Sequence, residues 1–369
     1  MQKNPLDILS AFWGFTAFRP TQEPIIQAAL GDVDVLALLP TGGGKSICFQ
    51  VPGLVKGGLT IVISPLIALM DDQVKSLKSK GIRATAVTSA MGFREIDILL
   101  NNAALGAFDF LYVSPERIQT PLFKERFKQM PVNLIVVDEA HCISEWGHDF
   151  RPSYLNIQSL REARPTIPIM ALTATATQRV KDDIIVALSL NKPYIHEVSF
   201  YRENLSYEVV QTPNKMGSII AYCNGKDHMT GIVYCSTRKA VKELAKVFMS
   251  NKLNASMYHG GMSPEERSAS LNQWMAGISP IMIATNAFGM GIDKANVKVV
   301  VHLDLPASIE NYVQEAGRGG RNGDKSFSVV LQNENDINSF KKNTLETIPT
   351  INEIKNVHRK LYQYFQIAL

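Results

Sequence analysis

The fold is decided by one stretch near the N-terminus, VLALLPTGGGKS, which covers residues 35–46. A short apolar run is followed by a turn with three glycines and then by Lys45 and Ser46. Glycines let backbone N–H groups surround phosphates where a strand passes into a helix N-terminus. Lys45 would then reach the β- and γ-phosphates of a nucleotide, and the Ser46 hydroxyl would ligate Mg²⁺. The strict pattern has glycine where Leu39 stands, so a glycine-rich turn without a ligand remains the alternative.

Short apolar runs alternate with helical stretches along the chain. Continuous hydrophobicity indicates parallel strands buried on both faces, and the alternation indicates doubly wound α/β domains. The strands of a first set are expected at residues 35–39, 60–63, 85–87, 110–113, 134–137 and 167–172. Those of a second set are expected at residues 206–210, 231–234, 255–258, 280–283, 297–302 and 327–331.

Small, polar or charged residues follow these strands, at the edge where open parallel sheets bind ligands. The run LIVVDEAH at residues 134–141 is a strand that ends in two acids. Asp138 would hold Mg²⁺, directly or through water, and Glu139 would orient and deprotonate the attacking water. Two solvated turn residues are the alternative.

Two arginines stand three residues apart in QEAGRGGRNG, residues 314–323. A guanidinium that reaches a γ-phosphate stabilises the charge of the transition state, which is the role expected for Arg318 and Arg321. Arginine pairs are usually solvated surface, but the flanking glycines and Gln314 favour a functional site.

Length and composition narrow the protein class. The chain has 369 residues, of which 46% are hydrophobic, so two or three domains are expected and a disordered chain is excluded. No apolar run reaches the roughly 18 residues of a membrane helix. Asn4 and Pro5 indicate the start of a helix of the mature domain rather than a signal peptide.

The four cysteines form no CxxC pair, which argues against zinc and disulfides and favours a reducing compartment. The net charge of +4 is compatible with nucleic acid.

The segment 199–205 separates the two strand sets. We therefore expect a first domain at residues 1–202, a second at 203–335 and a helical segment at 336–369. Residues 351–369 form an amphipathic pattern that ends without a polar tail, so the natural chain is expected to continue.

Taken together, these motifs resemble those of a superfamily 2 helicase with a DEAH box. The stretch CISEWGHDFRP at residues 142–152 is similar to the aromatic-rich loop of the RecQ family of DNA helicases. Further matching motifs lie at residues 13–22, 64–66, 114–117, 173–175, 258–261 and 284–293. The resemblance covers about residues 8 to 331.

The resemblance implies roles for individual residues. Gln22 would bond the adenine edge, with Phe15 and Arg19 packed on its faces. The phosphates would lie against Thr41, Gly42, Gly43 and Gly44, and Gly291 and Asp293 would lie near the ribose and phosphates. The residues that sense the single strand would be Trp146, Phe150 and Arg151, because aromatic faces stack on bases of any sequence. Contacts to the DNA backbone would come from Ser64, Arg117, Arg238, His259 and Thr285, although each could be purely structural.

The resemblance implies two RecA-like domains with ATP and Mg²⁺ in the cleft between them. The activity implied is ATP-driven translocation on single-stranded DNA in the 3′→5′ direction, with unwinding of partially duplex DNA in repair and recombination. A monomer in the bacterial cytoplasm or nucleoid is expected. An RNA helicase, and a nucleotide-switched binding module with weak unwinding, remain alternatives.

The sequence departs from the family at three places. Glu145 stands where Gln is usual, which adds negative charge beside DNA, and Asn322 stands where Asp is usual. No cysteine follows Cys235, so the usual four-cysteine zinc subdomain is not expected. The two substitutions should not remove chemistry, whereas the lack of that subdomain puts processivity, duplex affinity and substrate preference in question.

Overall fold

The computed structural model describes residues 4–40, 42–147, 149–199, 201–224, 230–289, 294–347 and 349–365. The chain divides into two compact units. The first comprises Met1–Leu205, Phe288–Asn296 and Ala307–Asp324, and the second comprises Ser206–Ala287, Val297–Pro306 and Lys325–Leu369. Each unit is described by itself.

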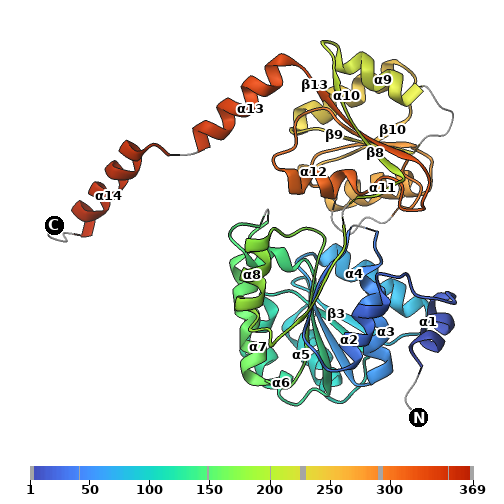
Figure 1. Ribbon diagram of the computed structural model, residues 1–369, viewed down its shortest axis with the longest axis vertical. Coiled ribbons are helices and arrows are strands. Elements are labelled where there is room, and N and C mark those ends of the chain that lie inside the picture. The colour runs from blue at the N-terminus through green and yellow to red at the C-terminus, as the bar shows by residue number, and fades with distance from the viewer. Residues whose placement is uncertain are drawn as a thin grey trace. The chain divides into compact units, whose positions relative to one another are not determined.

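The first unit is built on a seven-stranded sheet (Figure 1). Its spatial order is β3 (Ala84–Val87), β4 (Phe110–Val113), β2 (Leu59–Ile63), β5 (Val132–Val137), β6 (Ile169–Thr173), β1 (Val35–Leu38) and β7 (Tyr194–Glu197). Every neighbouring pair is parallel. The six predicted strands of this set are therefore confirmed. The sequence missed β7, because this edge strand alternates between half-buried and exposed residues and has no continuous apolar run.

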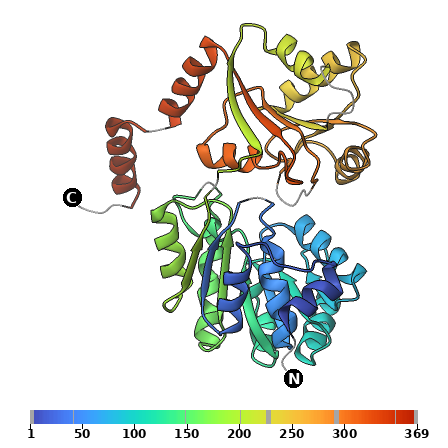
Figure 2. The ribbon, with the colours of Figure 1, turned by 45° about the vertical axis from the view of Figure 1, so that its right-hand side comes forward.

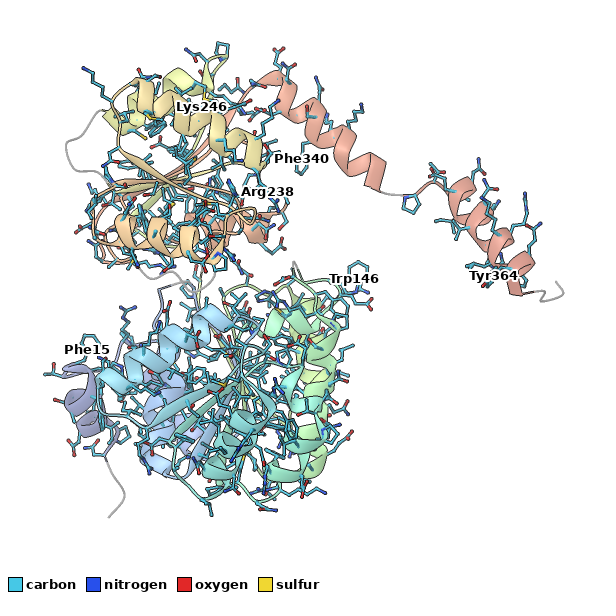
Figure 3. The ribbon with its side chains drawn as sticks, turned by 180° about the vertical axis from the view of Figure 1, so that it is seen from behind. Phe15, Trp146, Arg238, Lys246, Phe340 and Tyr364 are labelled. Carbon is cyan, nitrogen blue, oxygen red and sulfur yellow. The ribbon has the colours of Figure 1, made fainter. Side chains whose placement is uncertain are left out.

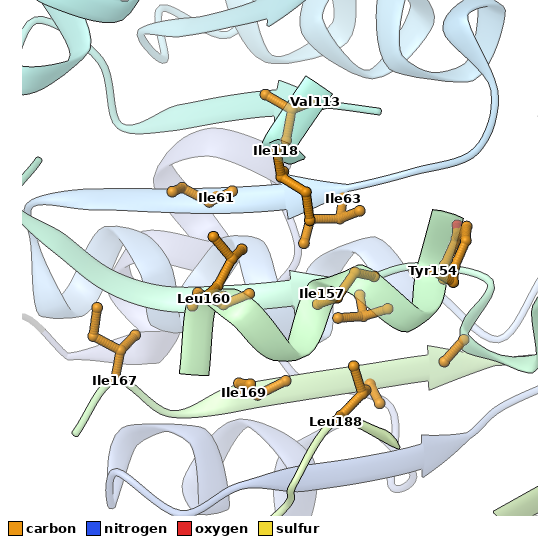
Figure 4. Close-up of a cluster of buried hydrophobic side chains, with 14 of the residues drawn as sticks. Ile61, Ile63, Val113, Ile118, Tyr154, Ile157, Leu160, Ile167, Ile169 and Leu188 are labelled. Atoms are coloured by element: carbon orange, nitrogen blue, oxygen red, sulfur yellow. The ribbon is translucent and has the colours of Figure 1, made fainter. Parts of the chain in front are cut away.

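Helices cover both faces of this sheet (Figure 2). One core cluster packs α5 (Phe93–Ala104), α6 (Pro121–Phe127), α7 (Gln158–Ala163) and α8 (Gln178–Ala187) against Leu36 and Leu38 of β1. Figure 4 shows part of this cluster, with Ile61 and Ile63 of β2 and Leu160 of α7. The other packs α2 (Glu23–Leu30), α3 (Lys45–Lys56) and α4 (Ile67–Ser79) against Val35 and Ala37. Successive residues of this strand thus pack into the cores on opposite faces of the sheet. Both kinds of position are buried, which explains why the strand is continuously hydrophobic. The doubly wound α/β prediction is confirmed.

Short elements complete the first unit. Helix α1 (Pro5–Trp13) starts as predicted, because the Asn4 side chain accepts a hydrogen bond from Leu6 N and Pro5 occupies the first turn. Three 3₁₀ turns connect the strands, namely η1 (Arg117–Gln119), η2 (Ala140–Ile143) and η3 (Pro152–Ile157). Helix α12 (Ile309–Ala316) lies in a segment that counts with this unit.

The second unit has a six-stranded sheet. Its order is β10 (Ala255–Tyr258), β11 (Ile281–Ala284), β9 (Gly231–Tyr234), β12 (Val299–His302), β13 (Ser326–Gln332) and β8 (Leu205–Gln211). The four pairings from β10 to β13 are parallel. The helices that follow are α9 (Lys215–Asn224), α10 (Arg238–Ser250), α11 (Pro264–Met275), α13 (Glu334–Thr347) and α14 (Ile351–Phe365). All six predicted strands of the second set are present.

The amphipathic helix expected from residue 351 onward is α14, which leaves Ile351, Ile354, Val357 and Leu361 exposed. Residues 366–369 lie outside the described part of the chain. Within the described ranges, no helix has both the length and the apolar character needed to cross a membrane.

Candidate nucleotide site and aromatic-rich loop

The phosphate-binding loop joins β1 to α3. Gly42 and Gly44 have φ angles of 80° and 77°, a left-handed conformation that favours glycine. Gly43 N donates to the carbonyl of Pro40 at 2.9 Å, and α3 begins directly after the loop at Lys45. The N-terminus of α3, whose first N–H groups have no helical partner four residues earlier, therefore adjoins the loop, as an anion site requires. Ser46 is half-buried in that turn, and Thr41 lies outside the described residues.

The segment before α2 holds this loop in place. Gln22 is 5% exposed; its Oε1 accepts from Arg19 N at 3.0 Å, and its Nε2 donates to Gly44 O at 3.2 Å. Arg19 Nη1 donates to Gly42 O at 2.6 Å. Phe15 is 57% exposed and lies at the surface of the first unit (Figure 3). Two of the three predicted adenine contacts thus also brace the phosphate loop, which sequence reasoning did not foresee.

The acid pair stands where β5 ends, at the same end of the sheet as the loop. Lys45 Nζ lies 3.8 Å from Glu139 Oε1. Glu139 has a φ of 49°, and its backbone N–H donates to Asp138 Oδ1 at 3.0 Å. Burial and the neighbouring Glu139 charge raise the pKa of Asp138 to about 6, against the opposing effect of Lys45. A bound cation would relieve both costs, so Asp138 and the Ser46 hydroxyl fit the donor set of Mg²⁺.

A buried histidine connects these acids to the next strand. His141 Nδ1 lies 2.9 Å from Thr173 Oγ1 and 3.4 Å from Glu139 Oε2. The Thr173 hydroxyl donates to Thr175 O at 3.0 Å. Tyr154 also reaches this region, since its hydroxyl donates to the Asp138 carbonyl at 3.0 Å.

The arginine segment lies in the first unit with the phosphate loop. A Cβ at Gly42 would come within 3.0 Å of Arg321 Cγ, so the structure brings Arg321 beside the loop. Arg318 is 6% exposed, and its Nε is buried without a hydrogen-bond partner among the described residues. Arg202 donates to the carbonyls of Gly317 and Gly320 at 3.1 and 2.5 Å, which fixes the turn that carries both arginines. Gln314 is half-buried on α12.

The aromatic-rich loop follows η2 and presents Trp146, which is 60% exposed (Figure 3). Ser144 Oγ accepts from Trp146 N at 3.1 Å and donates to Asp183 Oδ2 at 2.5 Å. Phe150 is half-buried and lines a pocket of about 390 Å³ with Trp146. Arg151 is occupied inside the loop, because it bonds Asp149 Oδ2 and the Pro65 carbonyl.

The residues that were predicted to contact the DNA backbone differ in how exposed their side chains are. Arg238 is exposed at the start of α10 (Figure 3), and Arg117 is half-buried in η1. Ser64 is 1% exposed at the end of β2, and its Oγ has no partner within the described ranges. His259 and Thr285 are buried; His259 Nδ1 accepts from Gly261 N, and Thr285 Oγ1 accepts from Ala287 N. Gly291 and Asp293 lie outside the described residues.

Sequence reasoning missed Arg179 and Asp183 of α8 and Arg202 before β8. These residues contact the aromatic-rich loop or the arginine segment, but they belong to no motif that the sequence singled out. In the described part of the chain, no group of three or more His, Cys, Asp or Glu side chains could hold a metal ion.

Comparisons with known proteins identify the class of this protein. The model of the DEAD/DEAH box helicase family matches residues 19–184, and that of the helicase conserved C-terminal domain matches residues 212–323. The fold is shared with DUF1998 helicase MrfA bound to DNA, with a TM-score of 0.76 and 17% identity over 93% of this chain and 53% of that one. It is also shared with S. cerevisiae Dbp5 bound to RNA and ADP BeF3, with a TM-score of 0.71 and 18% identity over 92% and 91% of the two chains. Fold and site thus define a superfamily 2 helicase core.

Sequence identity to individual relatives shows which family of superfamily 2 helicases this chain belongs to. ATP-dependent DNA helicase RecQ of Bacillus subtilis is 43% identical over 89% of this chain and 56% of its own length. The probable ATP-dependent DNA helicase RecS of the same organism is 40% identical over 96% of this chain and 72% of its length. The corresponding figures for RecQ of Pasteurella multocida are 40%, 90% and 52%. This chain belongs to the RecQ family, and it spans about half the length of these two RecQ proteins.

Proposed function

We propose that this chain is the motor core of an ATP-dependent DNA helicase. The observation that carries the proposal is the position of Lys45, 3.8 Å from Glu139, where the phosphate loop and the acid pair meet at one end of a parallel sheet. Nucleotide phosphates bind at such an end, and a lysine and a carboxylate there have complementary roles in phosphoryl transfer.

ATP would bind with its phosphates on the loop of Gly42, Gly43 and Gly44. Lys45 would attract the β- and γ-phosphates, and Arg19 and Gln22 would hold the loop rigid through their bonds to its carbonyls. Mg²⁺ held by Ser46 and Asp138 would neutralise phosphate charge. Thr41, Gly291 and Asp293 are proposed to complete the nucleotide contacts.

Glu139 would orient the attacking water and accept its proton. Arg321, beside the loop, and Arg318, with its buried Nε, would stabilise the charge that develops on the transferred phosphoryl group. Gln314 precedes these arginines on α12 and is proposed to help place them.

The proposed nucleic acid is DNA, in single-stranded and partially duplex form. The RecQ relatives of Pasteurella multocida and Bacillus subtilis, which are 40% and 43% identical to this chain, are named DNA helicases. The exposed Trp146 offers a surface for stacking bases. Ser64, Arg117, Arg238, His259 and Thr285, with Phe150 and Arg151, are proposed as further DNA contacts. Movement in the 3′→5′ direction, action as a monomer in the bacterial cytoplasm, and domain limits of 1–202, 203–335 and 336–369 belong to the same proposal.

Steady-state ATPase rates with no nucleic acid, with single-stranded DNA and with single-stranded RNA test the proposal. Strong stimulation by DNA alone is expected, followed by displacement of a strand from partially duplex DNA. Equal or greater stimulation by RNA would overturn the choice of DNA. Hydrolysis that neither nucleic acid stimulates would mean that this core does not couple ATP to DNA.

A further inference from the structure

The aromatic-rich loop packs on α8 through a cation–π contact that no sequence motif predicted. The guanidinium carbon of Arg179 lies 3.6 Å from the centroid of the Trp146 ring. This distance is well inside the 6 Å range of a cation–π interaction. One turn further along α8, Asp183 accepts the Ser144 hydroxyl, so the loop is anchored on the same helix at a second point.

The contact holds the indole without hiding it. The guanidinium lies over one face of the ring, yet Trp146 remains 60% exposed. A base can stack only on a ring that solvent can reach. A ring already held in one position loses less conformational entropy on binding than a mobile one.

The positive charge of Arg179 also changes the electrostatic surroundings of the Trp146 ring. The pocket beside Trp146 is lined by three acids, Glu145, Asp182 and Asp183. These carboxylates repel the phosphates of a strand that approaches the ring. A guanidinium stacked on the ring offsets that repulsion at the place where a base would bind.

We propose that Arg179 is a positioning residue for single-strand recognition, which holds the Trp146 ring with its exposed face ready for a base. This inference rests on the proposed DNA-dependent function. In this proposal Arg179 acts through Trp146 and has no role in ATP binding or hydrolysis.

The test compares wild type with Arg179→Ala, Arg179→Lys and, as a matched control, Lys124→Ala at an exposed position of α6. A cation–π contact at an exposed site contributes about 0.5–1 kcal/mol, so Arg179→Ala should raise the DNA concentration for half-maximal ATPase roughly two- to fivefold. The rate at saturating DNA should stay at the wild-type value. Arg179→Lys should restore part of the affinity, and Lys124→Ala should not change it.

A double-mutant cycle with Trp146→Ala separates positioning from a general charge effect. In the Trp146→Ala background, Arg179→Ala should cause a clearly smaller rise in the half-maximal DNA concentration, because only the lost charge then acts. An equal rise in both backgrounds, or no rise in either, would overturn the proposal.

A second measurement needs neither DNA nor ATP. Acrylamide quenching of the Trp146 fluorescence, obtained by subtracting a Trp146→Phe sample, should be stronger in Arg179→Ala than in wild type. Unchanged quenching would show that Arg179 does not hold the ring. The quenching could change as expected even though DNA does not stimulate the wild-type ATPase. That result would contradict the proposed DNA-dependent function but would support the contact between Arg179 and Trp146.

Discussion

The Nδ1 atom of His141 lies 2.9 Å from Oγ1 of Thr173, and both side chains are buried. The pair links the acids that follow β5 to the end of β6, because the same nitrogen lies 3.4 Å from Glu139 Oε2. Thr177, four residues after Thr173, caps α8, the helix that contacts the aromatic-rich loop. The contacts of His141 and the short chain segment from Thr173 to Thr177 thus connect the proposed catalytic base to the helix that contacts the proposed sensor of DNA.

We expect Thr173→Val to weaken the dependence of ATP hydrolysis on DNA several-fold. The substitution removes the hydroxyl that contacts His141, at a stability cost of about 1 kcal/mol. ATPase assays over a DNA titration measure the effect. Thr60→Val is the matched control, because the buried Thr60 hydroxyl bonds Asn133 at 2.9 Å at the start of β2. An equal loss of stimulation in both variants would point to general destabilisation.

Lys45→Ala should reduce ATP turnover by roughly 10²-fold or more, because it removes the cation that stabilises phosphate charge. Steady-state phosphate release measures the rate. Lys78→Ala, at an exposed position of α4, should hydrolyse ATP like wild type. Normal turnover in Lys45→Ala would refute the assignment of the phosphate loop.

Arg321→Ala should retain ATP binding and lose turnover by roughly 10³-fold, because such an arginine contributes mainly in the transition state. Binding of a fluorescent nucleotide and phosphate release are measured on the same sample. Lys246→Ala on α10 serves as the exposed control. Loss of ATP binding with an intact fold would show that the role of Arg321 is misassigned.

Trp146→Ala should lower the ratio of DNA-stimulated to DNA-free ATPase, because a stacking surface worth about 1–3 kcal/mol per base is removed. Both rates come from one DNA titration. Phe93→Ala removes an aromatic ring that is 76% exposed on α5 and should leave the ratio as it is. The same ratio in Trp146→Ala and wild type would make the loop merely structural.

Asp34→Ala should destabilise the first unit by about 3–5 kcal/mol, because it leaves the half-buried Arg161 guanidinium without its carboxylate partner. Asp34 is 5% exposed; Arg161 Nη2 donates to both of its carboxylate oxygens at 2.6 Å, and the amides of Ile169 and Asn191 donate to it as well. Urea unfolding measures the loss. Asp32→Asn, at an exposed partner of Lys56, should cost less than about 1 kcal/mol.

Much of the fold could be predicted because buried parallel strands carry a local signal. Each strand of the seven-stranded sheet except β7 is a short apolar run, and these runs predicted a parallel sheet. Strand β7 escaped prediction, since its residues alternate between half-buried and exposed at the sheet edge. The sequence also could not predict which of the proposed DNA contacts are exposed. Ser64 is buried, and Arg151 donates a hydrogen bond to the carbonyl of Pro65.

The elements that could be predicted are those whose signal lies in neighbouring residues. Glycines before Lys45, two acids at a strand end and apolar runs of strand length need only their neighbours to be read. Contacts between side chains that are distant in sequence became known from the folded structure alone. Asp183 reaches Ser144 across 39 residues, and Arg202 reaches Gly317 across 115. Such pairs depend on how strands order themselves and helices pack, so no periodicity in the chain encodes them.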